Sequence, residues 1–488
     1  MFILEELNFD HSYSRLPQAF YQPVLPTPLK NPHLIDFNAC AADLINLTHE
    51  QQDSTSFLKY MSGHGKIPGT RPLAAVYSGH QFGHYVPELG DGRAISIGEV
   101  VNLNGSRWDI QLKGAGLTAF SRMGDGRTVL RSSIREYLCS EAMYFLNIPT
   151  TRALCLIGSE TEVYRERVES GAILARVAPN HVRFGTFEYF YHSKRPNYVK
   201  TLADYLIETY FTNVSINDDK KYEKLLSRIV VTTAQLIAQW QAIGFAHGVM
   251  NTDNMSVLGI TIDYGPFGFL DTYNPEYISN HSDHQGRYAF NQQPNIALWN
   301  LTCLAEAFTV LIDTSAAKSA LEKYNDVYMA NFTHLMLQKF GLKQSSSKNH
   351  KLLQQALELM TSNEVDYTLF FRRLSDFDQE NHLNNVVRGL FINRNAFDNW
   401  AQHYAGALKT ENQNPEKRQQ KMDKVNPKYI LRNCLAEQAI QKAEAGDFSE
   451  VKKLKEILSR PFDDQLEHDQ YAQLPPEWSK SISVSCSS

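Results

Sequence analysis

The pattern of apolar and polar positions predicts a β-hairpin early in the chain. Residues 95–97 alternate between apolar and polar types, an Asn104-Gly105 pair follows, and residues 108–113 alternate again. Asn-Gly between two alternating runs is the strongest short-range signal of a hairpin. Because side chains alternate between the two faces of a strand, the second run places its apolar residues on one face and Lys113 on the other.

A glycine-rich turn, Gly90-Asp91-Gly92-Arg93, precedes this hairpin. Such a turn feeding a hairpin that ends in lysine is typical of the phosphate-binding loop and the strand-three lysine of protein kinases. Gly-Asp-Gly alone is a weak signal, because it occurs more often in ordinary turns. The turn therefore becomes a candidate phosphate site only together with Lys113.

Helical spacing of apolar residues predicts a helix that is capped near Ser132 or Ser133 and runs to Phe145. Glu136 lies off its apolar stripe and Glu141 lies on it. Either could pair with Lys113, as a helix glutamate does in kinases, and Glu136 could equally be a solvated acid. The periodicity leaves the choice open.

Further strands are predicted at 154–157, 161–165 and 171–177. Arg176 points away from the apolar face of the third strand, and Arg183 follows seven residues later. Two arginines near a phosphate site suit bidentate phosphate recognition. Ordinary surface charge explains them equally well at this stage.

The segment 247–271 carries the strongest chemical pattern. Asp253 and Asn254 stand side by side, an alternating apolar run surrounds Gly259, and Asp263 follows ahead of Tyr-Gly. The run predicts a tight hairpin that returns Asp263 to Asn254. Oxygen ligands of this kind suit a hard cation such as Mg²⁺. The pattern resembles the catalytic loop and the Asp-Phe-Gly segment of a protein kinase.

One position departs from the kinase pattern. When His247 is aligned with the kinase histidine, Asn254 falls on the kinase asparagine and Val249 falls on the catalytic aspartate. Valine can neither orient a hydroxyl nor accept its proton, and Asp253 is the nearest carboxylate that could. A standard phosphotransferase is therefore disfavoured. His247 itself is interpreted as a structural histidine.

The remaining sequence predicts mostly helices. One covers residues 222–243 and ends at Gly244, and another begins at Pro294 and runs to residue 311. The loop between them, residues 274–293, contains His281 and His284, which lack a third metal ligand nearby. Residues 409–428 are interpreted as a polar linker, and two short helices are expected at 429–445 and 449–458.

Composition narrows the functional class. The 488 residues are 43% apolar and 21% charged, with a net charge of −5, so the overall charge gives no indication of nucleic-acid binding. No apolar run reaches the roughly 18 residues of a membrane span. The acidic N-terminus resembles neither a secretory signal nor an Arg-rich transit peptide, and six cysteines without paired spacing favour a reducing compartment. Cytoplasmic localisation is expected.

Several motifs together are similar to those of the selenoprotein O family, also called the YdiU family, of protein adenylyltransferases. The resemblance covers nearly the whole chain. The matching motifs are Ser-Gly-His-Gln-Phe-Gly (78–83), Glu-Leu-Gly-Asp-Gly-Arg-Ala (88–94), Gln-Leu-Lys-Gly-Ala-Gly (111–116), Gly-Asp-Gly-Arg (124–127), His-Gly-Val-Met-Asn-Thr-Asp-Asn-Met-Ser (247–256), Asp-Tyr-Gly-Pro-Phe-Gly-Phe-Leu-Asp (263–271), Val-Asn-Pro-Lys-Tyr (425–429) and the Cys-Ser-Ser end.

The resemblance implies an α+β, protein kinase-like fold of two lobes. It would comprise an N-terminal extension (1–70), a β-rich N-lobe (71–197), a helical C-lobe (198–408) and a linker with a helical C-terminal tail (409–488). Residues 1–70 are Pro- and polar-rich with little periodicity, which predicts that this extension lies over the surface of the first lobe. The resemblance also implies that ATP binds in an inverted orientation, and that AMP passes to Ser, Thr or Tyr hydroxyls of protein substrates with release of pyrophosphate. Mg²⁺ or Mn²⁺ would assist, and neither nucleic acid nor membrane would take part.

The resemblance also assigns roles to individual residues. Asp253 would be the general base, Asn254 and Asp263 would bind the metal, and Glu136 would pair with Lys113. The nucleotide would be bound by Gly90, Gly92, Arg93, Lys113, Asp125, Gly126, Arg176, Arg183 and Asp263. Some members form a disulfide between a loop cysteine and a C-terminal cysteine or selenocysteine. Here Ser279 stands at the loop position, so Cys486 is expected to remain unpaired.

Three other functions are compatible with parts of this pattern. Phosphoryl transfer is disfavoured by Val249. No residue in the sequence excludes a second alternative, the transfer of UMP from UTP with Mn²⁺. A catalytically inactive nucleotide-binding scaffold would have no need of the metal-competent set Lys113, Asn254 and Asp263.

Overall fold

A large antiparallel sheet occupies the first 178 residues of the computed structural model, which describes residues 1–381 and 386–485. Within these residues the sheet has nine strands in the order β2-β4-β7-β8-β11-β10-β3, with β1 on β7 and β9 on β11. Its strands are β1 (Phe9–Asp10), β2 (Tyr21–Pro23), β3 (His33–Phe37), β4 (Leu73–Ala75), β7 (Ala94–Val101), β8 (Arg107–Lys113), β9 (Thr128–Val129), β10 (Arg152–Tyr164) and β11 (Val168–Ala178). Two two-stranded sheets stand apart: the hairpin of β5 (Gly79–Gln81) with β6 (His84–Val86), and the pair of β12 (Phe245–Ala246) with β13 (Gly268–Phe269).

The hairpin predicted from Asn104-Gly105 is confirmed as β7 and β8, with Ala94 paired to Lys113. The two strands predicted at 154–157 and 161–165 are instead one strand, β10. Its neighbours β11 and β3 flank it, and a register shift after Gly158 absorbs the small residues between the two apolar runs.

The first 70 residues are built into the sheet rather than laid over it. They supply β1 and both outer strands of the main path, β2 and β3. They also form two short helices, α1 (Ala39–Leu44) and α2 (Thr55–Met61). The expected surface extension is therefore corrected. The strands escaped prediction because they are short and pair with distant segments.

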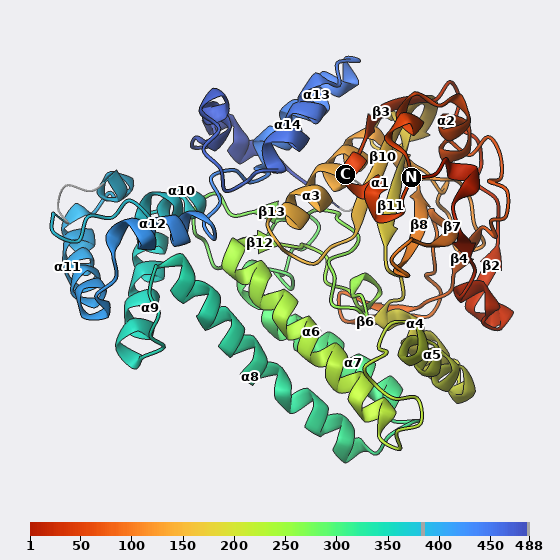
Figure 1. The fold of residues 1–488 in the computed structure, drawn as a ribbon, viewed down its shortest axis with the longest axis horizontal. Coiled ribbons are helices and arrows are strands. Elements are labelled where there is room, and N and C mark those ends of the chain that lie inside the picture. The colour runs from red at the N-terminus through yellow and green to blue at the C-terminus, as the bar shows by residue number, and fades with distance from the viewer. Residues whose placement is uncertain (382–385, 486–488) are drawn as a thin grey trace.

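Helix α3 (Leu130–Phe145) packs against β10 and β11, and α13 and α14 lie on its other side (Figure 1). The helix begins before the predicted serine caps. The hydroxyls of Ser132 and Ser133 instead donate to the carbonyl of Val129 within the first turn. Neither serine is the N-cap, which is Val129.

Helices make up most of the chain after residue 183. Helices α6 and α8 are long and run side by side (Figure 1). Helix α6 ends at Gly244, whose φ of 77° is the left-handed cap expected from sequence. The helices are α4 (Phe184–His192), α5 (Pro196–Thr209), α6 (Lys221–Ile243), α7 (Gln293–Phe308), α8 (Thr314–Lys339), α9 (Ser347–Ser362), α10 (Tyr367–Leu374), α11 (Arg394–Glu411), α12 (Pro415–Asp423), α13 (Asn433–Glu444) and α14 (Ser449–Leu458).

The expected polar linker at 409–428 is also corrected. Helix α11 continues to Glu411, and α12 follows after a short turn. Met422 is fully buried, and the buried Arg418 donates to the carbonyl of Phe377. One apolar residue and the stem of one arginine therefore anchor a helix whose sequence looks entirely polar.

Among the described residues, no helix is both long and apolar enough to cross a bilayer. Cys486 lies outside the described residues, so its expected unpaired state stays a prediction. The structure contains no disulfide within the part of the chain that it describes.

Candidate active site

A cleft of about 540 Å³ lies between the sheet and the loops that follow α6. Seven basic and four acidic side chains line it, so it is locally basic in a chain of net charge −5. Eleven residues assigned a role from sequence line this one cleft: Gly90, Gly92, Arg93, Lys113, Asp125, Gly126, Arg176, Arg183, Asp253, Asn254 and Asp263.

Lys113 pairs with Glu136 of α3, the one residue assigned a role from sequence that does not line the cleft. The Lys113 Nζ is 2.5 Å from Glu136 Oε2, and Arg176 contacts the other oxygen at 3.0 Å. Burial lowers the pKa of Lys113, against the opposing charges of Glu136 and Asp263. Glu136 thus fixes two cations in the cleft.

Glu141, the second candidate partner of Lys113, has a different role. Its carboxylate binds Arg152 at the start of β10 through two hydrogen bonds of 2.9 and 2.7 Å, and both side chains are 2% exposed. The ambiguity left by periodicity is thereby resolved.

Asp263 is the most heavily paired carboxylate of the cleft. Arg176 and Lys113 contact its Oδ1 at 2.5 and 3.3 Å, and Arg183 donates to its Oδ2. Burial opposes the charged form, but the three cations outweigh it and hold the pKa of Asp263 well below its usual range. Arg176 and Arg183 are both buried, which excludes their interpretation as surface charge.

Asp253 differs from Asp263 in its surroundings. It lies in a 3₁₀ turn (Thr252–Asn254), where Gln81 donates to its Oδ2 at 3.2 Å. Its buried Oδ1 has no hydrogen-bond partner within residues 1–381 and 386–485. Burial raises the pKa of Asp253 to about 6, against the opposing charge of Arg183. A carboxyl group with this pKa and a free oxygen is suited to proton transfer near neutral pH.

Close approach of the backbone shapes the slot around Asp253. A Cβ added to Gly79 would lie 2.6 Å from Asp253 Oδ1, and one added to Gly185 would lie 2.0 Å from the carbonyl of Ser78. Because glycine has no Cβ, the backbone of β5 and of the start of α4 can pack closely around Asp253.

The segment between Asn254 and Asp263 is not the predicted hairpin. Gly259 does form a turn, but Ser256 pairs with Arg183 and Thr261 pairs with Thr150. The two sides of the alternating apolar run therefore pair with two distant segments, and not with each other as in a hairpin. Asn254 and Asp263 still line the same cleft.

Asn254 donates its side-chain amide to the carbonyl of Val249 at 3.0 Å. That bond directs the nitrogen to the backbone, so the amide oxygen is the atom available to a cation. With Asp263, it forms an oxygen donor pair that fits a hard divalent ion. Val249 lines the cleft and offers no titratable group there.

The glycine-rich turns form the cleft rim. Gly90 has a φ of 66°, and a Cβ there would lie 2.4 Å from the Phe120 ring. Gly126 also has a positive φ, of 70°. Asp125 pairs with Arg165 at 2.8 Å, so it neutralises one cation at the rim.

Sequence reasoning missed Gln81 and Asn251. Gln81 reaches Asp253 across 172 residues, and Asn251 accepts bonds from the Tyr288 hydroxyl and the Phe82 amide. Gln81 stands inside a motif quoted for the resemblance, which is the signal that could have drawn attention to it.

The structural interpretation of His247 is confirmed. It is buried, its Nε2 lies 2.9 Å from the carbonyl of Ile262, and it stacks on Trp240. His281 and His284 join no group of three metal-ligating side chains among the residues described.

Residues 3–459 match the protein family described as "Protein adenylyltransferase SelO". The chain belongs to the SelO family. It is accordingly an enzyme of the nucleotidyltransferase class. The SelO relatives described as "Protein nucleotidyltransferase YdiU" include those of Myxococcus xanthus (49% identical, all of both chains), Thioalkalivibrio sulfidiphilus (51%, 99% of each) and Thiobacillus denitrificans (49%, all of both).

Proposed function

We propose that this enzyme transfers AMP from ATP to Ser, Thr or Tyr hydroxyls of proteins and releases pyrophosphate. The observation that carries the proposal is the position of Asp253, a carboxylate with one free oxygen and a pKa of about 6. The position of the kinase base is occupied by Val249, so the acceptor hydroxyl must approach the nucleotide where Asp253 is.

The nucleotide would lie inverted relative to ATP in a kinase, within a kinase-like arrangement of two lobes. Lys113, Arg176 and Arg183 would hold the β- and γ-phosphates as the leaving group, with the glycine-rich rim closing over them. Their burial supports this role, because a desolvated cation stabilises developing charge more strongly than an exposed one.

Asn254 and Asp263 would hold Mg²⁺ or Mn²⁺, which would neutralise charge on the phosphates. Asp253 would orient the acceptor hydroxyl and accept its proton as its oxygen attacks the α-phosphorus. Gln81, which donates to Oδ2, would fix the orientation of the Asp253 carboxylate. Glu136 would keep Lys113 and Arg176 in place.

Labelled nucleotides test the proposal. A protein acceptor is incubated with the enzyme, Mg²⁺ and ATP labelled on either the α- or the γ-phosphate. We expect the α label to enter protein and the γ label to remain in pyrophosphate. Entry of the γ label would instead establish phosphoryl transfer, and entry of neither would indicate a scaffold. Parallel α-labelled UTP with Mn²⁺ determines whether UMP transfer competes.

A further inference from the structure

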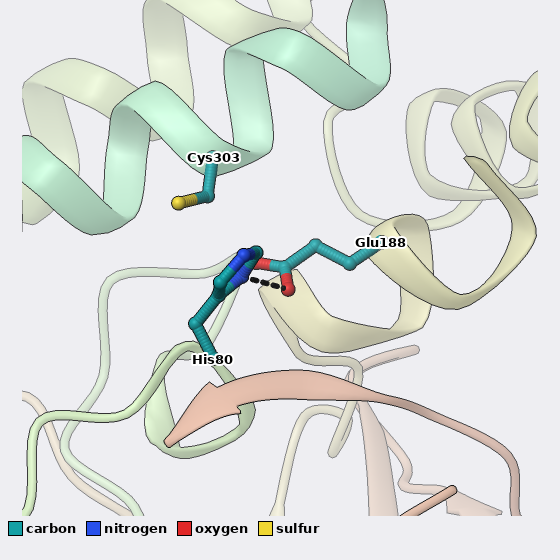
Figure 2. A group of neighbouring side chains, drawn as sticks. All are labelled: His80, Glu188 and Cys303. Carbon is teal, nitrogen blue, oxygen red and sulfur yellow. Dashed lines mark hydrogen bonds and ion pairs between the residues drawn. The ribbon is translucent and has the colours of Figure 1, made fainter. Parts of the chain in front are cut away.

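A second group of metal-ligating side chains lies behind the proposed base, outside the nucleotide cleft. His80, Glu188 and Cys303 each offer one ligand atom, and these atoms all lie within 4.8 Å of one another. Figure 2 shows His80 of β5 and Glu188 of α4 in contact, with Cys303 of α7 beside them. None of them lines the nucleotide cleft.

Glu188 supplies an independent sign that a ligand is missing from this group. Its side chain is fully buried, and its Oε2 contacts His80 Nδ1 at 2.9 Å and accepts from the Thr252 hydroxyl at 3.0 Å. Its buried Oε1 has no partner anywhere in the described part of the chain. A buried carboxylate oxygen without a partner is costly, so it calls for a cation or a donor.

We propose that His80, Glu188 and Cys303 form a binding site for one Zn²⁺ ion. An imidazole nitrogen, a carboxylate oxygen and a thiolate are the three donor types that zinc takes in proteins, and water would complete the tetrahedron. Zinc bonds of about 2.0–2.3 Å place ligand atoms roughly 3–4 Å apart, so the group must contract only by about 1 Å. Mg²⁺ is excluded because it does not take sulfur ligands.

The surroundings of the group suit a metal site. Thr252 donates to the Glu188 carboxylate, as partners outside the ligand set orient ligating carboxylates in metalloproteins. His80 and Cys303 are only partly buried, which leaves a route for the ion. Binding would displace the proton of the Cys303 thiol to solvent, because the thiolate is the ligand form.

A metal ion at this site would link β5, α4 and α7 next to the turn that carries Asp253. The His80 amide donates to the Thr252 hydroxyl at 2.7 Å, and the next residues in each segment, Gln81 and Asp253, bond to each other. One ion would therefore cross-link the β5 strand, α4 and α7 around the turn that carries Asp253. The expected consequence is a higher midpoint of thermal unfolding in Zn²⁺.

Cobalt absorption tests the site without reference to catalysis. Co²⁺ is titrated into the full-length protein in excess Mg²⁺, which occupies oxygen-ligand sites. We expect thiolate-to-cobalt charge-transfer absorption that saturates at one equivalent and disappears when Zn²⁺ is added. Cys303→Ser should abolish it, whereas the matched control Cys40→Ser, at an exposed cysteine, should retain it.

Thermal unfolding supplies the second readout. Zn²⁺ should raise the midpoint of the wild type and of Cys40→Ser, and should leave Cys303→Ser unchanged. Equal midpoints of all three proteins without metal would show that the variants fold normally. The proposal is overturned if the wild type shows no thiolate band, or if Cys303→Ser keeps the same band. Because neither readout uses nucleotide, the result is independent of the proposed transferase activity.

Discussion

The side chain of Asp253 bears most directly on the proposed chemistry. We predict that Asp253→Asn lowers the rate of AMP transfer by about 10²–10⁴-fold, the usual contribution of a general base. Nucleotide affinity should change little, because Lys113, Arg176 and Arg183 remain. Turnover assays and calorimetric titration with a non-hydrolysable ATP analogue measure the two effects. The exposed Asp219→Asn serves as the control.

The raised pKa of Asp253 predicts opposite effects of pH on activity and stability. Proton acceptance requires the charged form, so kcat/KM should fall as the pH drops through about 6. A pKa raised in the folded state favours folding at low pH, and this contribution is lost as the pH rises through about 6. At pH 8 the buried charge destabilises the fold by on the order of 3 kcal/mol.

Asp253→Asn should therefore be more stable than the wild type at pH 8, and the difference should shrink towards pH 4. Urea denaturation at the two pH values measures this. If Asp253→Asn is instead less stable than the wild type at pH 8, contacts stabilise the charged carboxylate. That result would contradict the raised pKa of Asp253.

Among single residues, the sequence located the candidates but not their partners. Lys113, Asn254 and Asp263 were selected from spacing within motifs, and all three line one cleft. The choice between Glu136 and Glu141 depended on which way each side chain of α3 faces, and both proved to be buried. The bond between Gln81 and Asp253 spans 172 residues, so no local pattern contains it.

At the scale of elements, the two buried glutamates of α3 are expected to differ in role: Glu141 stabilises the fold, and Glu136 supports catalysis. We predict that Glu141→Gln lowers the free energy of unfolding by about 3–5 kcal/mol, because it leaves the buried Arg152 without its counter-ion. The kinetic constants of the folded fraction should stay unchanged. Glu136→Gln should instead lower kcat, because Lys113 and Arg176 lose one of the two carboxylates that they share and keep only Asp263. Equal losses of kcat in the two variants would refute the distinction.

The contact between β5 and the base turn predicts a second effect. Gly79→Ala would bring a methyl group to 2.6 Å from Asp253 Oδ1, so the carboxylate must move. We expect kcat to fall at least about tenfold, since small displacements of catalytic groups cost up to about 10²-fold. The matched control is Gly406→Ala in α11, where no atom lies within 4 Å of the added Cβ. A normal kcat in Gly79→Ala would mean that the base tolerates displacement.

Elements whose turn or cap is encoded in their own sequence could be predicted. Elements that depend on pairing with distant segments could not. The β7–β8 hairpin and α6 carry a turn or a cap in their own sequence. In contrast, β2 and β3 are three and five residues long and gain their partners only across the sheet. The turn at Gly259 was located correctly, but the flanking residues pair with Arg183 and Thr150, which the alternation could not reveal.

At the scale of the whole molecule, a basic cleft is embedded in an acidic protein. We predict that the affinity for free pyrophosphate, measured by calorimetry without metal, falls as NaCl rises from about 0.05 to 0.5 M, because salt screens the exposed cations at the rim. The buried Arg176 and Arg183 are screened less, so part of the affinity should persist. Affinity that is independent of salt would assign binding to the buried cations alone.

The placement of β3 has a consequence for the order of events during synthesis. This edge strand ends at Phe37, but its neighbour β10 begins only at Arg152. At about 5–20 residues per second, the ribosome needs roughly 6 to 23 s to make the intervening chain. For that time β3 has no native partner in the nascent chain. Until β10 has been made, the edge of β3 is therefore open to pairing with strands of other chains.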